Sequence, residues 1–293
     1  MKKTNRRDLL KKMALGTAAF SSVPAMGNVF STSGSALKGR IQHSACRWCY
    51  DSIPLEDLCI AAKKIGLVGI DLVGPADWPV LKKHGLISTM CNGAEINLVD
   101  GWNDPQFHPR LIDSYLKHID LVADAGYKNL ICFSGSRRGK DDETGWKNCT
   151  TGLKQIMSKA EQRGVTIVME LLNSKVDHKD YQCDRTAWGV ELCKRIGSSH
   201  FKLLYDIYHM QIDEGDVIHT IREFHPYIAH YHTGGVPGRN EIDEQQELFY
   251  PAIMRAILAT GYQGYVAQEF IPTPEDLAGK LKSLRKAVRI CDV

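Results

Sequence analysis

The chain has 293 residues, 43% of which are hydrophobic, and a formal net charge of +3. This length and composition suit one large α/β domain or two small ones, and show no bias toward disorder. The charge is uneven, because residues 1–27 hold six Lys and Arg against one Asp and so contribute +5. Subtracting this from +3 leaves −2 for the rest, which argues against nucleic acid as the main partner.

The first 27 residues resemble a twin-arginine export signal. Arg6 and Arg7 lead into "DLLKK", and the short apolar run "MALGTAAFSSVPA" ends in small residues. That run is too short to span a bilayer, and no other window reaches transmembrane length. We therefore predict a signal peptide over 1–27, a Ser/Gly-rich linker over 28–39 and the main domain over 40–293. The expected location is the periplasm, and a basic, unstructured N-terminus is the alternative interpretation.

The cysteines do not form a recognisable disulfide framework. Their number is odd, their spacing is irregular, and the one C-x-x-C pair has no second pair to complete a zinc ribbon. Free thiols suit a protein that folds in the cytoplasm before export. The nine are Cys46, Cys49, Cys59, Cys91, Cys132, Cys149, Cys183, Cys193 and Cys291.

Beyond the linker, strand-like and helix-like segments alternate. Helical patterns such as 54–66 and 109–126 separate the apolar runs, and several of them end at glycine. Eight such repeats in about 250 residues predict an α/β fold with a single (β/α)8 barrel. A doubly wound sheet is the alternative, but its G-x-G-x-x-G turn is absent. The eight strand-like runs are "RIQHSAC", "GLVGIDLVG", "LISTMCNG", "KNLICFSG", "VTIVMELLN", "FKLLYDIYH", "YIAHYHTGG" and "GYVAQEFIP".

Four consecutive predicted strands end in a residue that can bind metal. Glu170, Asp206, His232 and Glu269 close the fifth to eighth strands. One strand-end carboxylate often only caps the next helix, but four in successive units converge on one barrel mouth. Three carboxylates this close would repel unless a cation neutralised them. The pattern predicts one divalent ion, with Mn²⁺, Mg²⁺ or Co²⁺ favoured and Zn²⁺ as an alternative.

Several strings resemble the hydroxypyruvate isomerase family of xylose-isomerase-like barrels, which contain sugar isomerases and epimerases. These strings are "MELLN" (169–173), "LLYDIYHMQ" (203–211), "HYHTGGVPGRNE" (230–241) and "GYQGYVAQEF" (261–270). The likeness extends over residues 40–275.

The resemblance implies roles for the strand-end residues and for two others. Glu170, Asp206, His232 and Glu269 would be the metal ligands. Glu170 and Glu269 would also be the catalytic proton-transfer pair, while His209 and Arg239 would bind substrate oxygens. The implied reaction moves a proton next to a carbonyl of a small sugar or hydroxy-keto acid, through an enediolate that the ion stabilises.

Two departures leave the substrate open. His232 stands where hydroxypyruvate isomerases often have Gln and ketose 3-epimerases have His, and the loop "NEIDEQQELFYP" differs from the usual hydroxypyruvate isomerase sequence. A ketose 3-epimerase or other keto-sugar epimerase is therefore the first alternative, and a non-catalytic periplasmic sugar-binding protein is another. A metal-dependent endonuclease would need more ligands and a basic face. A homo-oligomer is compatible with the sequence.

Four further residues fit either a site role or an ordinary structural one. His43 and Trp48, near the first strand, would line the pocket or pack in the core. Asn173 and Lys175 follow Glu170 and would contact the substrate or serve as plain loop residues.

Overall fold

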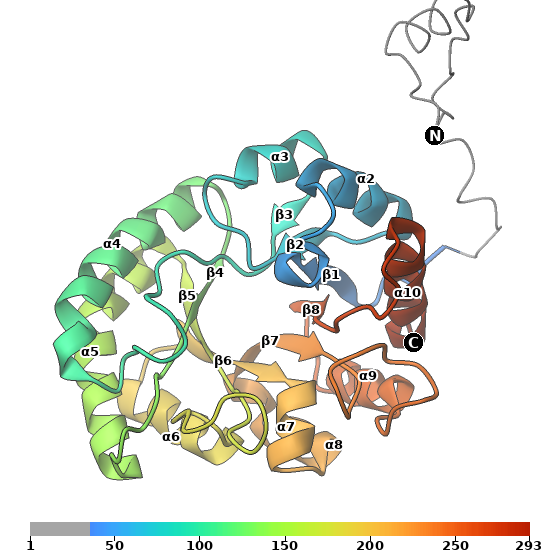
Figure 1. Ribbon diagram of the computed structural model, residues 1–293. Helices are drawn as coiled ribbons and strands as arrows, with labels where there is room; N and C mark the ends of the chain where they lie inside the picture. Colours follow the sequence, from blue (N-terminus) through green and yellow to red (C-terminus); the bar gives the residue numbers. More distant parts are fainter. Residues whose placement is uncertain (1–35) are drawn as a thin grey trace, which may run out of the picture. The chain divides into compact units, whose positions relative to one another are not determined.

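Eight parallel strands form a curled sheet with helices around its outside (Figure 1). The computed structural model describes residues 36–293; the predicted signal peptide and residues 28–35 of the predicted linker lie outside this range. The strand order is β3-β2-β1-β8-β7-β6-β5-β4. This arrangement confirms the predicted barrel of alternating strands and helices.

Each predicted apolar run contains one strand. The strands are short, and most of their residues are buried, as expected for a parallel sheet with one face toward the barrel interior and the other under helices. Their bounds are β1 (Gln42–Cys46), β2 (Gly69–Asp71), β3 (Ile87–Ser88), β4 (Asn129–Cys132), β5 (Thr166–Glu170), β6 (Phe201–Asp206), β7 (Ile228–Thr233) and β8 (Tyr265–Gln268).

The ring closes between β3 and β4 through a single residue beyond the end of β3. Cys91 forms parallel bridges with Val73 on one side and Leu130 on the other. Its N–H donates to the carbonyl of Asn129 at 2.9 Å, and its carbonyl accepts from the N–H of Ile131 at 3.0 Å. The sheet is therefore a closed barrel with one narrow seam.

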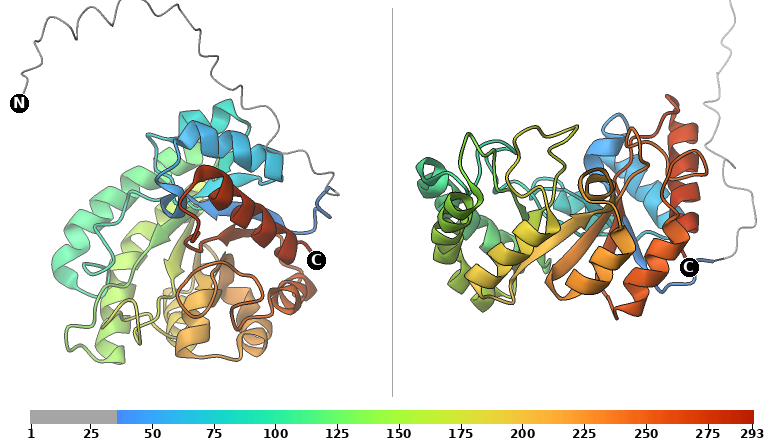
Figure 2. Two further views of the ribbon diagram at one scale, coloured as in Figure 1. Left: turned by 45° about the vertical axis from the view of Figure 1, so that its right-hand side comes forward. Right: turned by 90° about the horizontal axis from the view of Figure 1, so that it is seen from below.

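Helices cover the outside of the barrel, and α10 lies beside both α9 and α2, so the last helix meets the first α-helix of the ring (Figure 2). Several helices end at a glycine with positive φ, among them Gly66, Gly164 and Gly197. The α-helices are α2 (Leu55–Ile65), α3 (Trp78–Lys83), α4 (His108–Asp124), α5 (Asp142–Arg163), α6 (Thr186–Ile196), α7 (Ile207–Asp213), α8 (Val217–Phe224), α9 (Tyr250–Ala259) and α10 (Leu277–Cys291). The described residues also form three 3-10 helices: η1 (Arg47–Tyr50), η2 (Pro105–Phe107) and η3 (His225–Tyr227).

The cysteines and the helices bear on two of the sequence observations. All nine cysteines are free and buried, so none forms a disulfide. Among residues 36–293, no helix combines the length and the apolar character needed to cross a membrane.

Candidate metal centre and active site

The four predicted strand-end residues come together at one end of the barrel. Glu170 ends β5, Asp206 ends β6, His232 lies on β7, and Glu269 directly follows β8. These strands are neighbours in the sheet, so their ends lie side by side. One ligand atom from each residue lies within 4.8 Å of those of the other three, and all four residues are buried.

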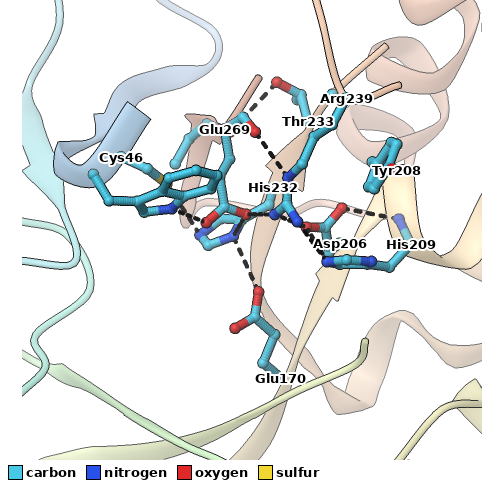
Figure 3. A network of polar contacts seen from close by, with 12 residues as sticks. Cys46, Glu170, Asp206, Tyr208, His209, His232, Thr233, Arg239 and Glu269 are labelled. Atoms are coloured by element: carbon cyan, nitrogen blue, oxygen red, sulfur yellow. Dashed lines mark hydrogen bonds and ion pairs between the residues drawn. The ribbon is translucent and has the colours of Figure 1, made fainter. Parts of the chain in front are cut away.

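His232 lies between two of the acids (Figure 3). Its Nδ1 is 2.6 Å from Oε2 of Glu269 and 3.4 Å from Oε1 of Glu170. Arg239 reaches the same carboxylates from the loop after β7: its Nη2 is 2.6 Å from Oε2 of Glu269 and 3.1 Å from Oδ2 of Asp206. The cluster thus sets three carboxyl groups against one guanidinium and one imidazole.

Burial is the largest influence on the pKa of each carboxyl group in this cluster. It raises the pKa of Asp206 to about 8, although Arg239 acts in the opposite direction. Burial also raises the pKa of Glu170. For Glu269, burial is outweighed by His232 and Arg239, which hold its pKa well below the usual range. The site therefore combines one firmly ionised carboxylate with two carboxyl groups that bind protons readily unless a cation lies nearby.

Asp206 is both a helix cap and a member of this cluster. Its Oδ1 accepts from the backbone N–H of His209 at 3.2 Å and so caps α7. Its Oδ2 faces Arg239. Capping and membership of the cluster are therefore compatible, because the two oxygens of Asp206 have different partners.

His209 and Arg239, the two predicted substrate contacts, lie against each other. Nη1 of Arg239 donates to Nε2 of His209 at 2.8 Å. The guanidinium also lies 5.3 Å from the ring centroid of Trp48 and 5.1 Å from that of Tyr208. Burial lowers the pKa of His209, so this imidazole is neutral. Asn173 approaches its other ring nitrogen at 2.6 Å. The structure therefore places Asn173 at the site rather than in a plain loop.

Trp48, His43 and Lys175 each had two possible roles in the sequence, and their contacts in the structure differ. Trp48 is 39% exposed, and its Nε1–H donates to Oε1 of Glu269 at 2.7 Å, so it belongs to the site. His43 is buried in β1, and neither of its ring nitrogens has a hydrogen-bond partner among residues 36–293. Lys175 donates to the carbonyls of Ile212 and Asp213 at 2.8 and 2.7 Å, so it caps α7.

Sequence reasoning missed one buried carboxylate next to the cluster. Asp71 ends β2, and its Oδ2 lies 2.8 Å from Nε2 of His232 and 3.0 Å from Nε2 of His230. The signal was present, because "GLVGIDLVG" places an acid at a strand end just as the last four strands do. Asp71 ends the second strand and so stands apart from the four consecutive strands that carry the other site residues.

The comparisons with known proteins begin with a family model. Residues 79–287 match the family described as xylose isomerase-like TIM barrel. Among curated proteins, the chain is 35% identical over 120 residues to a 2-oxo-tetronate isomerase of Cupriavidus necator, covering 41% of this chain and 45% of that protein. It is 29% identical over 118 residues to a putative hydroxypyruvate isomerase of Homo sapiens, covering 40% and 43%. The match thus spans less than half the length of these two relatives.

A longer match links the chain to another relative of the same kind. It is 26% identical over 246 residues to a 2-oxo-tetronate isomerase of Haemophilus influenzae, covering 78% of this chain and 93% of that protein. Two solved structures share the fold. They are an AP endonuclease, family 2, from Brucella melitensis (22% identity, 83% and 97% coverage, TM-score 0.71) and a D-psicose 3-epimerase with D-tagatose from Clostridium cellulolyticum (17%, 86% and 98%, 0.70). At these identities the likeness shows the fold alone.

Proposed function

Since the chain belongs to the xylose isomerase-like TIM barrel family, we propose that it is a divalent-metal-dependent isomerase or epimerase of small sugars or hydroxy-keto acids. The observation that carries this proposal is the buried cluster at the barrel mouth. Three carboxyl groups and one imidazole converge there, each from a different strand end. The names of the curated relatives, which are isomerases, support the same class of reaction.

The ligand atoms of the cluster suit a divalent ion. Glu170, Asp206 and Glu269 offer oxygens, and Nδ1 of His232 faces the carboxylates because Nε2 is already bonded to Asp71. Arg239 supplies only one compensating positive charge, so a divalent ion would remove most of the remaining repulsion. Three oxygens and one nitrogen favour Mn²⁺, Mg²⁺ or Co²⁺, with Zn²⁺ as an alternative.

The protein's own residues supply proton transfer and orientation. When bound, the ion polarises the substrate carbonyl and so makes the neighbouring C–H group more acidic. Glu269, which its low pKa keeps ionised, can accept that proton. Glu170, whose pKa is raised by burial, is suited to return a proton from the β5 side. His209 and Arg239 lie next to both acids and are placed to orient substrate oxygens.

Two substrate classes remain within this proposal. The curated relatives favour a short hydroxy-keto acid of the hydroxypyruvate or 2-oxo-tetronate type. His232 favours the second candidate, a ketose 3-epimerase, since this position resembles those enzymes rather than hydroxypyruvate isomerases.

Deuterium incorporation separates the candidates. Hydroxypyruvate, 2-oxo-tetronate and a panel of ketoses would be incubated with the purified protein and Mn²⁺ in deuterated water. An isomerase places deuterium on the carbon that was the carbonyl, whereas a 3-epimerase places it on C3 with inverted configuration. The Glu170→Gln, Glu269→Gln double variant is the matched control and should incorporate none. Incorporation into no substrate would favour the sugar-binding protein instead.

We also propose that the protein is exported to the periplasm through a twin-arginine-type signal. The support is the sequence alone: Arg6 and Arg7, the short apolar run that follows them, and a basic surplus confined to residues 1–27. These residues lie outside the described structure.

A further inference from the structure

A second buried polar cluster lies behind His232, inside the barrel. Its centre is Asp71, at the end of β2 and in register with Cys46 of β1. Asp71 is fully buried, and its Oδ2 contacts Nε2 of both His232 and His230, at 2.8 and 3.0 Å. His230 and His232 are two residues apart on β7, so their side chains point to the same face of the sheet. Their ring centroids lie 5.2 Å apart.

The other oxygen of Asp71 is also occupied. Oδ1 accepts hydrogen bonds from the hydroxyl groups of Thr89 and Ser44, the latter at 3.4 Å. A carboxylate has about four lone-pair positions. Five protein donors now surround them, including the weak Sγ–H donor of Cys46 at 3.9 Å from Oδ2. Cys46, Asp71 and His232 lie close enough together to hold an ion. With every acceptor position of Asp71 used by the protein, however, positioning explains this cluster better than a second metal site.

The contact with Asp71 determines which nitrogen of His232 is free. An ionised carboxylate only accepts hydrogen bonds, so Nε2 of His232 must carry a proton. Nδ1 of His232 is therefore the ring nitrogen left for an ion, on the side of Glu269 and Glu170, once any proton there is displaced.

We propose that Asp71, supported by His230, is a positioning residue that holds His232 in the Nε2–H tautomer with Nδ1 directed at the ion. This inference rests on the metal site of the proposed function. A carboxylate behind a ligating histidine fixes the ring orientation and makes the imidazole a stronger ligand, and its loss typically weakens metal binding by about 10- to 100-fold. Asp71→Asn should therefore raise the dissociation constant for Mn²⁺ by that factor.

A double-mutant cycle distinguishes positioning from general damage. Mn²⁺ affinity would be measured by calorimetry for the wild type, Asp71→Asn, His232→Gln and the double variant. If Asp71 acts through His232, then Asp71→Asn should have almost no effect once His232 is replaced. An equal loss in both backgrounds would overturn the inference. Ser44→Ala is the matched control, because it removes a contact to Oδ1 only, and it should change the affinity by less than about threefold.

The wild-type protein supplies a test that needs no variant. Loaded with Zn²⁺ and labelled with ¹⁵N, it should show His232 coordinated through Nδ1 and protonated at Nε2. Coordination through Nε2, or two bound ions with one lost in Asp71→Asn, would contradict the positioning role. A wild type that binds no divalent ion would refute the proposed function itself. Normal binding with an unaffected Asp71→Asn variant would refute the inference alone.

Discussion

The affinity for a divalent ion should fall steeply as the pH is lowered from about 8 to about 6. Burial raises the pKa of Asp206 to about 8, so in the metal-free protein its carboxyl group is protonated below that pH. The pKa of His232 is also raised, because Cys46, Glu269 and Asp71 outweigh the opposing effect of burial. A bound ion needs both groups deprotonated and must displace their protons. Lower pH therefore favours the protons over the ion.

The size of the effect follows from the number of protons displaced. One proton, that of Asp206, makes the affinity fall about tenfold for each pH unit below its pKa, or about 100-fold from pH 8 to pH 6. A second proton, on His232, makes the dependence steeper, up to about 100-fold for each unit. In Asp206→Asn the affinity should be lower at every pH, and the slope should lose one proton.

Calorimetric titration with Mn²⁺ measures both quantities. The dissociation constant gives the slope against pH, and titrations in buffers with different ionisation heats count the released protons directly. Between one and two protons should be released near neutral pH. A change of less than about threefold between pH 6 and 8, without proton release, would refute the assignment of Asp206 as a buried ligand with a raised pKa.

Four further variants have defined outcomes. Trp48→Phe removes the N–H group that donates to Glu269. The loss of this hydrogen bond, worth about 1.5 kcal/mol, should lower kcat/KM about tenfold. The acid limb of the pH profile of kcat/KM should move to higher pH. An unmoved acid limb would mean that the bond does not lower the pKa of Glu269. Glu170→Gln and Glu269→Gln should each reduce turnover by about 10²- to 10⁴-fold with the variants still folded by circular dichroism, and near-normal turnover in either would contradict the proton-transfer role. The Arg6→Lys, Arg7→Lys double variant should remain in the cytoplasmic fraction, as measured by immunoblots of cell fractions. A periplasmic amount equal to that of the wild type would refute the export signal.

The barrel and most of the site were predictable because both depend on regular spacing. Each apolar run became one strand, and parallel strands place their carboxyl ends together, so Glu170, Asp206, His232 and Glu269 had to converge. The contacts among these residues, by contrast, depend on rotamers. Neither spacing nor composition indicates that Arg239 reaches two of the acids.

The parts that the sequence left open or did not indicate depend on the direction of side chains rather than on residue type. Trp48 lies in η1, directly after β1, and the pattern of "CRWCY" does not say which way that turn points. Asp71 ends a strand only three residues long, and its bond to His232 requires the register between β1 and β2. The helix α7 follows β6 without a linker because Asp206 caps it, so the strand-like string "FKLLYDIYH" covers two elements.

The seam between β3 and β4 gives this barrel an uneven resistance to local opening. Across the seam, the backbone hydrogen bonds are those of Cys91. The side-chain amide of Asn129 adds one hydrogen bond to the carbonyl of Thr89, at 3.0 Å. The strands from β4 through β8 to β2 are joined pair by pair by parallel ladders, with one register shift at Leu203 and Leu204 between β6 and β7. Segments with few hydrogen bonds exchange their amide protons first. Transient local opening should therefore occur mainly at the seam, where none of the four predicted metal ligands lies. The barrel can open there while the geometry of its mouth is preserved.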